Sequence, residues 1–403
     1  MHRIDGPLIF ITKTHPIGYR ELVECVDGEG NTRMGMVLDT SQDVVVAQIF
    51  EGTSGLTMPD TKVRFRGKPL TLGVSKKMLG RVFNGIGQPI DGGPAPVGEV
   101  ELDINGKPIN PTSREYPRDF IQTGISVIDG MNTLIRGQKL PIFSGNGLPH
   151  NELASQIARQ AKIRGAQTEF AVVFVAMGVK HDVARYFIDS FEETGVLENV
   201  ALFLSLADDP SIERLITPRT ALTLAEHLAF SHDMHVLVIM TDISNYCVSI
   251  REISSIRGEI PSRKGYPGYL YSVLAVLYEM FGRGIYPPIA GLPSLSRLMK
   301  DGIGEGMTRG DHPHLASQLF AAYSYVKDVR NLASVIGEEE LTPLDHQYLE
   351  FGEYFERKYV SQAKDEDRTI EQTLDLGWEA LKQLPAEELH RITEEELEKY
   401  YGQ

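Results

Sequence analysis

The chain has 403 residues, 42% of them hydrophobic, and carries a formal net charge of −15. This length suits several domains, and the apolar content is sufficient for well-packed cores. The acidic excess argues against nucleic acid as a partner, because no basic surplus is available to neutralise phosphates. Cys25 and Cys247 lie far apart without metal-type spacing, which predicts buried, reduced thiols. We find no signal peptide and no apolar run long enough to cross a bilayer, so any membrane role is expected to be indirect.

The first part of the chain alternates short β-rich segments with turns. The predicted strands cover residues 7–12, 19–26, 33–38 and 44–50. The sequence DGEGN at residues 27–31 is a strong hairpin signal between the second and third of them. We therefore predict a small antiparallel barrel over residues 1–72, with a docking or oligomerising role and no catalytic residue.

The pattern then changes to alternating strands and helices. A stretch rich in Gly and Pro at residues 80–94 predicts an ordered connector. After it, apolar runs at 140–143, 170–176, 200–206 and 236–240 alternate with helical patterns at 151–162, 182–193, 219–231 and 269–280. This alternation predicts a parallel sheet covered on both faces. We assign residues 73–308 to this α/β domain, including a linker at 73–119.

The centre of this domain is the stretch LPIFSGNGLPHNELASQIAR at residues 140–159. An apolar strand, a glycine-bearing turn and a helix follow one another, which is the layout of a phosphate-binding loop. In such a loop, backbone N–H groups and the positive end of the helix face the phosphates. The candidate binding residues are Ser144, Gly145, Asn146, Gly147, Leu148, Pro149, His150 and Asn151.

The loop departs from the usual pattern G-x-x-x-x-G-K-[ST] at the positions that carry the chemistry. His150 replaces the Lys, and Asn151 replaces the hydroxyl residue that binds Mg²⁺. A short imidazole, mostly neutral at pH 7, does not copy a charged Lys on a flexible stem. Mg²⁺ held without the hydroxyl is poorly placed for phosphoryl transfer. Two interpretations stay open: a loop that holds a nucleotide without turning it over, and a plain strand, turn and helix without a ligand.

A second candidate residue ends the apolar run HVLVIMTD at 235–242. In nucleotide-binding domains, an acid at the carboxyl end of a strand can lie beside the phosphate loop and hold a water molecule of Mg²⁺. An acid after a buried strand is also a common helix cap. Together with the loop at 144–151, the pattern favours Asp242 as part of a nucleotide site.

Beyond about residue 309 the chain becomes helical and acidic. Leu374, Trp378 and Leu381 form an apolar stripe along one helix, and Thr393 with Glu396 forms a capping box for the last one. We predict a helical domain over residues 309–403. Its acidic surface is either a solvated face or a docking surface for another subunit.

Several motifs closely resemble the B subunit of archaeal A-type and vacuolar-type rotary ATPases. The resemblance rests on FIQTGISVIDGMNTLIRGQKLPIFSGNGLPHNELASQIARQA at 120–161, ADDPSIERLITPR at 207–219, HVLVIMTDISNY at 235–246 and GIYPPIAGLPSLSRLM at 284–299. It runs through the whole chain in order. The LPHNE loop distinguishes this subunit from the catalytic A subunit, which keeps a Lys and a Ser or Thr.

This resemblance implies a fold, a function and a set of partners. The fold would be an N-terminal β-barrel, a central RecA-like α/β nucleotide-binding domain of the P-loop type with a parallel sheet, and a C-terminal helical domain. The chain would be a non-catalytic, regulatory subunit that alternates with catalytic A subunits in an A3B3 ring, together with central and peripheral stalk subunits. Such a ring synthesises or hydrolyses ATP, coupled to transport of protons or Na⁺, at the cytoplasmic face of the cell membrane. ATP or ADP would bind at the A–B interface, with Mg²⁺ held mainly by the A subunit.

The resemblance also assigns one residue to catalysis in the neighbouring subunit. Arg297, in LPSLSRLM, matches the arginine finger of the family. A planar, permanently charged guanidinium suits the stabilisation of a transferring phosphoryl group. The alternative for Arg297 is an ordinary surface salt bridge. Arg263 and Tyr266 are further interface candidates, with packing as their default role.

Two departures from the family pattern bear on this role. The chain lacks an extended strand and loop that the family carries between Arg283 and Gly284, and Met307 replaces a Lys. The shortened junction supports an alternative function as a structural ring and assembly subunit with little catalytic contribution. A third alternative, an autonomous NTPase motor on RNA, is disfavoured by His150, Asn151 and the acidic charge.

Overall fold

The computed structural model describes residues 2–50, 52–106, 118–142, 144, 148–163, 169–256, 259–262, 265–267 and 299–402. The chain forms two compact units. The first combines Met1–Ile109 with Thr168–Ala275, and the second combines Asn110–Gln167 with Val276–Gln403.

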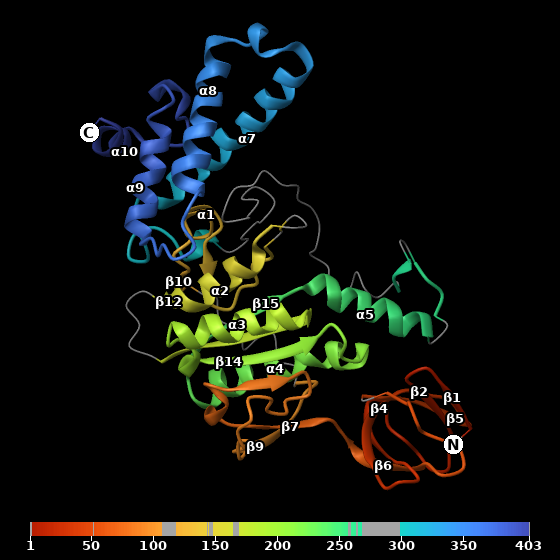
Figure 1. The fold of residues 1–403 in the computed structure, drawn as a ribbon. Coiled ribbons are helices and arrows are strands. Elements are labelled where there is room, and N and C mark those ends of the chain that lie inside the picture. The colour runs from red at the N-terminus through yellow and green to blue at the C-terminus, as the bar shows by residue number, and fades with distance from the viewer. Residues whose placement is uncertain are drawn as a thin grey trace. The chain divides into compact units, whose positions relative to one another are not determined.

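The first unit begins with a six-stranded antiparallel sheet that curls into a barrel (Figure 1). Its strands, in the order β1-β2-β5-β4-β3-β6, are β1 (Arg3–Asp5), β2 (Leu8–Thr12), β3 (Glu21–Val26), β4 (Thr32–Thr40), β5 (Val44–Ile49) and β6 (Lys62–Pro69). Apolar side chains at alternating positions, among them Ile9, Val23 and Val37, form its buried core. The predicted hairpin at 27–31 is confirmed: Asp27 and Asn31 are joined backbone to backbone, and Gly30 has a φ of 89°.

The same unit contains the predicted parallel sheet. Its order is β15-β13-β14-β8, formed by β15 (His235–Thr241), β13 (Phe170–Val179), β14 (Val200–Leu206) and β8 (Val82–Asn84), and all three neighbouring pairs are parallel. The prediction of a connector over 80–94 was therefore wrong in part. Val82 and Phe83 are buried and add an edge strand to the sheet, although the surrounding Gly and Pro residues resemble a loop.

Helices cover both faces of the parallel sheet, as Figure 1 shows for α3 (His181–Glu193) and α4 (Ser211–Ser231). Side chains alternate between the faces, so Phe174 of β13 meets Phe187 and Phe191 of α3, with ring centroids 4.7 and 5.2 Å away. Its neighbours Val173 and Val175 join the cluster of α4 instead. The helix predicted at 219–231 in fact begins at Ser211. Pro218, which marked the predicted boundary, lies inside α4. A third helix, α5 (Ile243–Ile256), follows β15.

The first unit also carries a small antiparallel ribbon of β7 (Thr71–Val74) and β9 (Val100–Asp103). A short 3-10 helix, Lys76–Met78, follows β7, and another, Leu197–Asn199, precedes β14. The helix predicted at 269–280 lies outside the described residues.

The second unit contains a three-stranded antiparallel sheet and a group of helices. The sheet order is β11-β10-β12, formed by β10 (Phe120–Gln122), β11 (Leu134–Ile135) and β12 (Lys162–Ile163), with α1 (Ser126–Met131) and α2 (His150–Gln160) between these strands. The strand predicted at 140–143 is not formed over 140–142, and residue 143 is outside the described part.

The C-terminal part of this unit is helical, as predicted. It contains α7 (His312–Ile336), α8 (Pro343–Tyr354) with a π-helical continuation (Phe355–Val360), α9 (Ile370–Leu381), and α10 (Glu394–Glu396) with the π-helical turn Leu397–Tyr401. Short 3-10 helices lie at Met299–Asp301, Glu338–Glu340 and Ala386–Glu388.

The predicted features of these helices are present. Leu374, Trp378 and Leu381 are buried on α9, and the capping box of Thr393 and Glu396 is formed. Trp378 Nε1 donates a hydrogen bond to Asp311, 2.7 Å away, so the apolar stripe also carries a buried polar contact.

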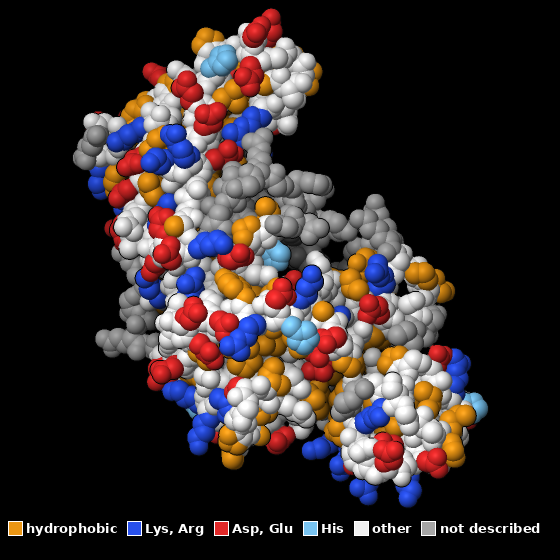
Figure 2. Space-filling model, viewed as in Figure 1, with side chains coloured by type: hydrophobic (Ala, Val, Ile, Leu, Met, Phe, Trp, Pro, Cys, Tyr) orange, Lys and Arg blue, Asp and Glu red, His pale blue; other side chains and the backbone are white. Residues whose placement is uncertain are grey.

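Three further observations concern the described residues of both units. Cys25 and Cys247 are buried, as predicted, and neither is in a disulfide. In the described ranges, no helix combines the length and the apolar character that crossing a bilayer requires. Acidic and basic side chains are interspersed over the face shown in Figure 2.

Candidate functional site

The described part of the predicted phosphate loop leads directly into α2. Pro149 occupies the N-cap position, with φ −77° and ψ 57°, and its side chain makes no capping hydrogen bond. An uncapped helix start presents backbone N–H groups and the positive end of the helix dipole, which suits an anion. Ser144, Leu148, Pro149, His150 and Asn151 are described and all lie in the second unit, whereas Gly145, Asn146 and Gly147 lie outside the described residues.

His150 is turned back onto the loop. Its backbone N–H and its Nδ1 both contact the Leu148 carbonyl oxygen, at 2.8 and 2.9 Å. A carbonyl oxygen only accepts, so this contact requires the proton on Nδ1. The imidazole is thus held by the backbone of the loop itself, whereas a Lys in this position extends to a phosphate.

Asn151 lies beside it in the first turn of α2. Its Oδ1 atom is buried and has no hydrogen-bond partner within the described part of the chain. A buried amide oxygen without a partner is unfavourable by itself and suits a donor from a ligand or from water bound to Mg²⁺. The described residues therefore fit a phosphate group held by backbone N–H groups, and they supply no cationic side chain in place of the missing Lys.

The position of α2 is fixed by the segment before α9. Gln156, fully buried on α2, donates from Nε2 to the carbonyl oxygens of Ala363 and Glu366, at 3.1 and 3.0 Å. Arg159 donates to the Lys364 carbonyl oxygen at 3.0 Å. The C-terminal part of the chain thus holds the helix that follows the phosphate loop.

Asp242 lies in the first unit, at the junction of β15 and α5. Its φ of 59° is in the left-handed region, where Asp is one of the few residues other than Gly to occur. Its carbonyl oxygen accepts from the N–H groups of Asn245 and Tyr246, at 2.8 and 3.4 Å, and so starts the helix. Asp242 and the phosphate loop therefore belong to different compact units.

The carboxyl edge of the parallel sheet around Asp242 is polar. Asn245 Nδ2 donates to the carbonyl oxygens of Met177 and Gly178 at the end of β13, at 3.0 Å each. Arg214, a buried residue of α4, donates to the carbonyl oxygens of Leu206 and Ala207 after β14, at 3.2 and 3.1 Å. This edge is where ligands bind in open α/β sheets.

Two buried charged residues, Arg214 of α4 and Asp129 of α1, were not predicted from the sequence. Arg214 lies within ADDPSIERLITPR, and its charge next to apolar residues was the one sequence feature that could have indicated a buried, functional arginine. Asp129 accepts hydrogen bonds from the backbone N–H groups of Thr123 and Gly124 and from the Thr123 hydroxyl. Burial raises the pKa of Asp129 to about 7.

Arg297, the predicted arginine finger, lies outside the described residues, and so does Arg263. Tyr266 is described, and the guanidinium of Arg251 lies 5.2 Å from the centroid of its ring.

Comparison with known protein families accounts for most of the chain. The beta-barrel domain of the ATP synthase alpha/beta family matches residues 1–67, and its nucleotide-binding domain matches residues 124–296. The C-terminal domain of V and A type ATP synthase matches residues 301–401. The chain belongs to the ATP synthase alpha/beta family. Its C-terminal domain assigns it to the V- and A-type members, so it is a subunit of a rotary ATP synthase.

Individual members of the family agree with this assignment. The chain is 55% identical to the V-type ATP synthase beta chain of Halothermothrix orenii, over 99% of this chain and 96% of that protein. Among solved structures, it is similar to the ATP synthase subunit NeqB of Nanoarcheaum equitans, with a TM-score of 0.68 and 34% identity. That similarity covers 94% of this chain and 100% of NeqB.

The alignment with the Halothermothrix protein also shows a difference in length. It extends over 444 residues, whereas this chain has 403. This member of the ATP synthase alpha/beta family therefore lacks residues that its relative carries.

Proposed function

We propose that the chain is the non-catalytic, regulatory B subunit of an A-type or V-type rotary ATP synthase. In this role it alternates with catalytic A subunits in an A3B3 ring and contacts the central and peripheral stalk subunits. The observation that carries the proposal is the loop before α2, where His150 stands in place of the Lys and contacts the Leu148 carbonyl oxygen. A site with this loop lacks the cation that phosphoryl transfer requires.

ATP or ADP would bind at the interface with the A subunit, and Mg²⁺ would be held mainly by that subunit. The chain's own loop, from Ser144 to Asn151, would form a degenerate site that holds a nucleotide without turnover or stays empty. Asp242 would separately hold a water molecule of Mg²⁺ at the carboxyl end of β15. The N-cap residue Pro149, whose side chain makes no capping hydrogen bond, and the buried Oδ1 atom of Asn151 support binding of a phosphate group at the loop.

Arg297 would reach the nucleotide of the neighbouring A subunit. Its guanidinium carries a permanent charge and several donors, so it can stabilise negative charge on the transferring phosphoryl group. The position of Arg297 within LPSLSRLM supports this role.

The chain has exposed apolar side chains that suit contacts with ring neighbours. Leu332, Val335 and Ile336, at the end of α7, are 44%, 81% and 45% exposed. Such a group on one helix end is typical of a surface that is covered in an assembly. The assembled ring would lie at the cytoplasmic face of the cell membrane and couple ATP synthesis or hydrolysis to transport of protons or Na⁺.

A second function is favoured by the length difference from the Halothermothrix relative. If the missing residues lie near 283–284, they adjoin the segment that leads to Arg297. The chain would then act as a structural ring and assembly subunit with little catalytic contribution.

Replacement of Arg297 distinguishes the two functions. In rings reconstituted with A subunits, Arg297→Ala should lower ATP turnover by roughly 10³-fold or more, the lower end of the range for arginine fingers. Arg297→Lys should restore little, because Lys keeps the charge but loses the planar set of donors. Size-exclusion chromatography should show unchanged ring assembly.

The matched control is Arg185→Ala. Arg185 is an exposed arginine of α3 that pairs with Asp189 at 2.8 Å, and its loss should leave turnover unchanged. Wild-type turnover in the Arg297→Ala ring would exclude the finger assignment and favour the structural function.

A further inference from the structure

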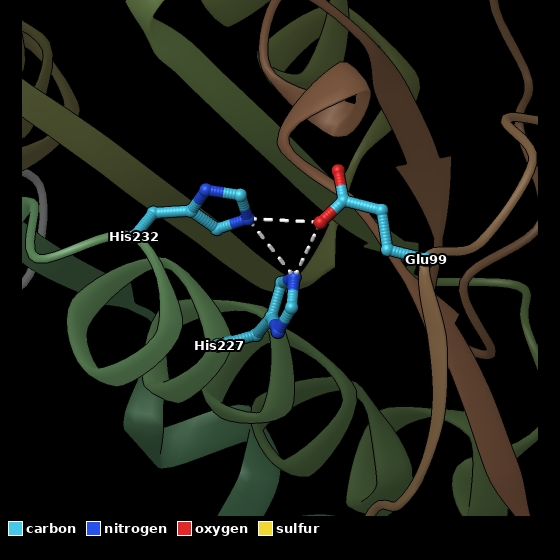
Figure 3. A group of neighbouring side chains, drawn as sticks. All are labelled: Glu99, His227 and His232. Atoms are coloured by element: carbon cyan, nitrogen blue, oxygen red, sulfur yellow. Dashed lines mark hydrogen bonds and ion pairs between the residues drawn. The ribbon is translucent and has the colours of Figure 1, made fainter.

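Three side chains with metal-binding atoms converge in the first unit, and none of them is among the predicted nucleotide residues. Glu99 directly precedes β9, His227 lies in the last turns of α4, and His232 is the C-cap residue of that helix. Figure 3 shows both imidazoles directed at the same carboxylate oxygen of Glu99. The Oε2 atom of Glu99 lies 3.2 Å from His227 Nε2 and 2.9 Å from His232 Nε2. The two Nε2 atoms are 3.2 Å apart.

These three separations resemble the edges of a metal coordination shell. Protein nitrogen and oxygen ligands lie about 2.0 to 2.2 Å from an ion such as Zn²⁺. Adjacent ligands at such distances are roughly 3.0 Å apart at octahedral angles and roughly 3.4 Å apart at tetrahedral angles. Small movements of the side chains would therefore place one ion in contact with all three atoms.

Hydrogen bonds alone do not satisfy all three contacts well. A carboxylate only accepts, so each histidine that bonds to Glu99 must carry a proton on its Nε2 atom. If both do so, two N–H groups face each other across 3.2 Å and neither accepts from the other. A central cation removes this conflict, because all three atoms then face it with lone pairs.

The surroundings hold the ligands in place. The backbone N–H of Glu99 donates to the Val74 carbonyl oxygen at 2.8 Å, and its Oε1 atom accepts from the Lys76 N–H at 3.2 Å. This second contact leaves Oε2 for the histidines. The side chain of Lys76 forms an ion pair with Glu169, which directs its charge toward another acid. His227 is only 6% exposed, so its ring has little freedom.

We propose that Glu99, His227 and His232 form a binding site for a divalent first-row transition-metal ion such as Zn²⁺. Two imidazoles and one carboxylate are a common ligand set for these metals, with water in the remaining positions. The ion would join the C-terminal end of α4 to the ribbon of β7 and β9. Its role would be structural: the ion would stabilise the first unit and would take no part in the proposed nucleotide chemistry.

Metal titration of the full-length chain tests the proposal. The protein is stripped with EDTA, dialysed, and titrated with Zn²⁺ by calorimetry. A parallel titration with Co²⁺ is followed by its visible absorption. We expect one equivalent of each ion to bind, and Zn²⁺ to raise the melting temperature. Millimolar Mg²⁺ should not displace Zn²⁺, because Mg²⁺ prefers oxygen ligands.

Variants of the two more exposed ligands assign the site. Glu99→Gln and His232→Gln should each weaken Zn²⁺ binding by at least about 10-fold. The double variant should no longer bind one equivalent of Zn²⁺. The matched control is His181→Gln, which removes an exposed histidine that contacts Asp208 at 3.1 Å, and it should bind Zn²⁺ like the wild type. Circular dichroism melts in EDTA show whether each variant is folded.

Two results would overturn the proposal. One is a folded wild-type chain that binds no stoichiometric Zn²⁺ or Co²⁺. The other is equal Zn²⁺ affinity in the wild type and in the folded Glu99→Gln and His232→Gln variants, because the ion would then bind elsewhere.

Discussion

Among single residues, Asp129 has a carboxyl group whose burial costs solvation free energy, and its hydrogen bonds show its structural role. Its two oxygen atoms accept from the N–H groups of Thr123 and Gly124 and from the Thr123 hydroxyl, at distances between 2.6 and 3.1 Å. Asp129 therefore fixes the turn between β10 and α1. Loss of solvation still outweighs these bonds, and it raises the pKa of Asp129 to about 7.

This raised pKa predicts a dependence of stability on pH. In the unfolded chain Asp129 loses its proton near the ordinary aspartate pKa of 3.8, whereas burial in the folded chain keeps the proton up to about pH 7. Its contribution to the free energy of unfolding should therefore fall as pH rises from about 4 to about 7, by up to roughly 1.4 kcal/mol per pH unit. Chemical denaturation of the wild type and of Asp129→Asn, at several pH values, measures the difference.

The buried His312 is the matched control for this experiment. Burial lowers the pKa of His312 to about 4, so its contribution to stability is lost as pH falls from about 6.5 to about 4. The difference between wild type and His312→Gln should therefore change with pH in the opposite direction. A difference between wild type and Asp129→Asn that is constant from pH 4 to 7 would contradict the role of Asp129.

At the scale of elements, α2 depends on the segment between the π-helical continuation of α8, which ends at Val360, and α9. Gln156→Leu keeps the volume of the side chain but leaves the carbonyl oxygens of Ala363 and Glu366 without this donor. Each lost partner of a buried group costs about 1 to 3 kcal/mol, so we expect a destabilisation of roughly 2 to 4 kcal/mol. Urea denaturation measures it, and hydrogen exchange should show faster opening of α2.

An ion pair between the same two elements provides the control. Lys364 contacts Glu152 of α2 at 3.3 Å, and the Lys364 side chain is 61% exposed. Glu152→Gln should cost no more than about 1 kcal/mol, as for other exposed pairs. If Gln156→Leu costs as little as Glu152→Gln, the buried hydrogen bonds do not fix α2.

The elements that were predicted well from the sequence are those whose own residues carry a clear hydrophobic pattern. The run at 200–206 coincides with β14, because a strand buried on both faces is apolar at nearly every position. The start of α4 was missed because Pro218 suggests a helix boundary, although this proline is accommodated within the helix. β8 was missed because three residues between glycines carry too little pattern.

The candidate functional residues were likewise recognisable only where neighbouring residues in the sequence form a pattern. The phosphate loop and Asp242 were recognisable because each stands at the end of an apolar run, next to a helical pattern. The cluster of Glu99, His227 and His232 was not, because Glu99 is more than a hundred residues distant from the two histidines in sequence. Only folding brings such residues together. The roles of Arg297, the phosphate loop and Asp242, and the boundaries at 72 and 308, remain predictions.

At the scale of the whole molecule, two features point to function within an assembly. The chain belongs to the ATP synthase alpha/beta family, yet its phosphate loop has His150 and Asn151 where catalysis requires a Lys and a hydroxyl. It also has exposed apolar side chains at the end of α7. From these properties we expect turnover to arise in a neighbouring subunit.

ATPase turnover should therefore depend on the combination of subunits. We expect no measurable turnover from this chain alone and little from the proposed catalytic A partner alone, because in this proposal each supplies groups that the other lacks. The mixture should form a hexameric ring and hydrolyse ATP, which a coupled assay and analytical ultracentrifugation measure on the same sample. A ring that assembles but stays inactive would instead support the structural function, with the shorter chain unable to place Arg297. Turnover by this chain alone would contradict both functions, because it would require catalysis from a loop in which His150 contacts its own backbone.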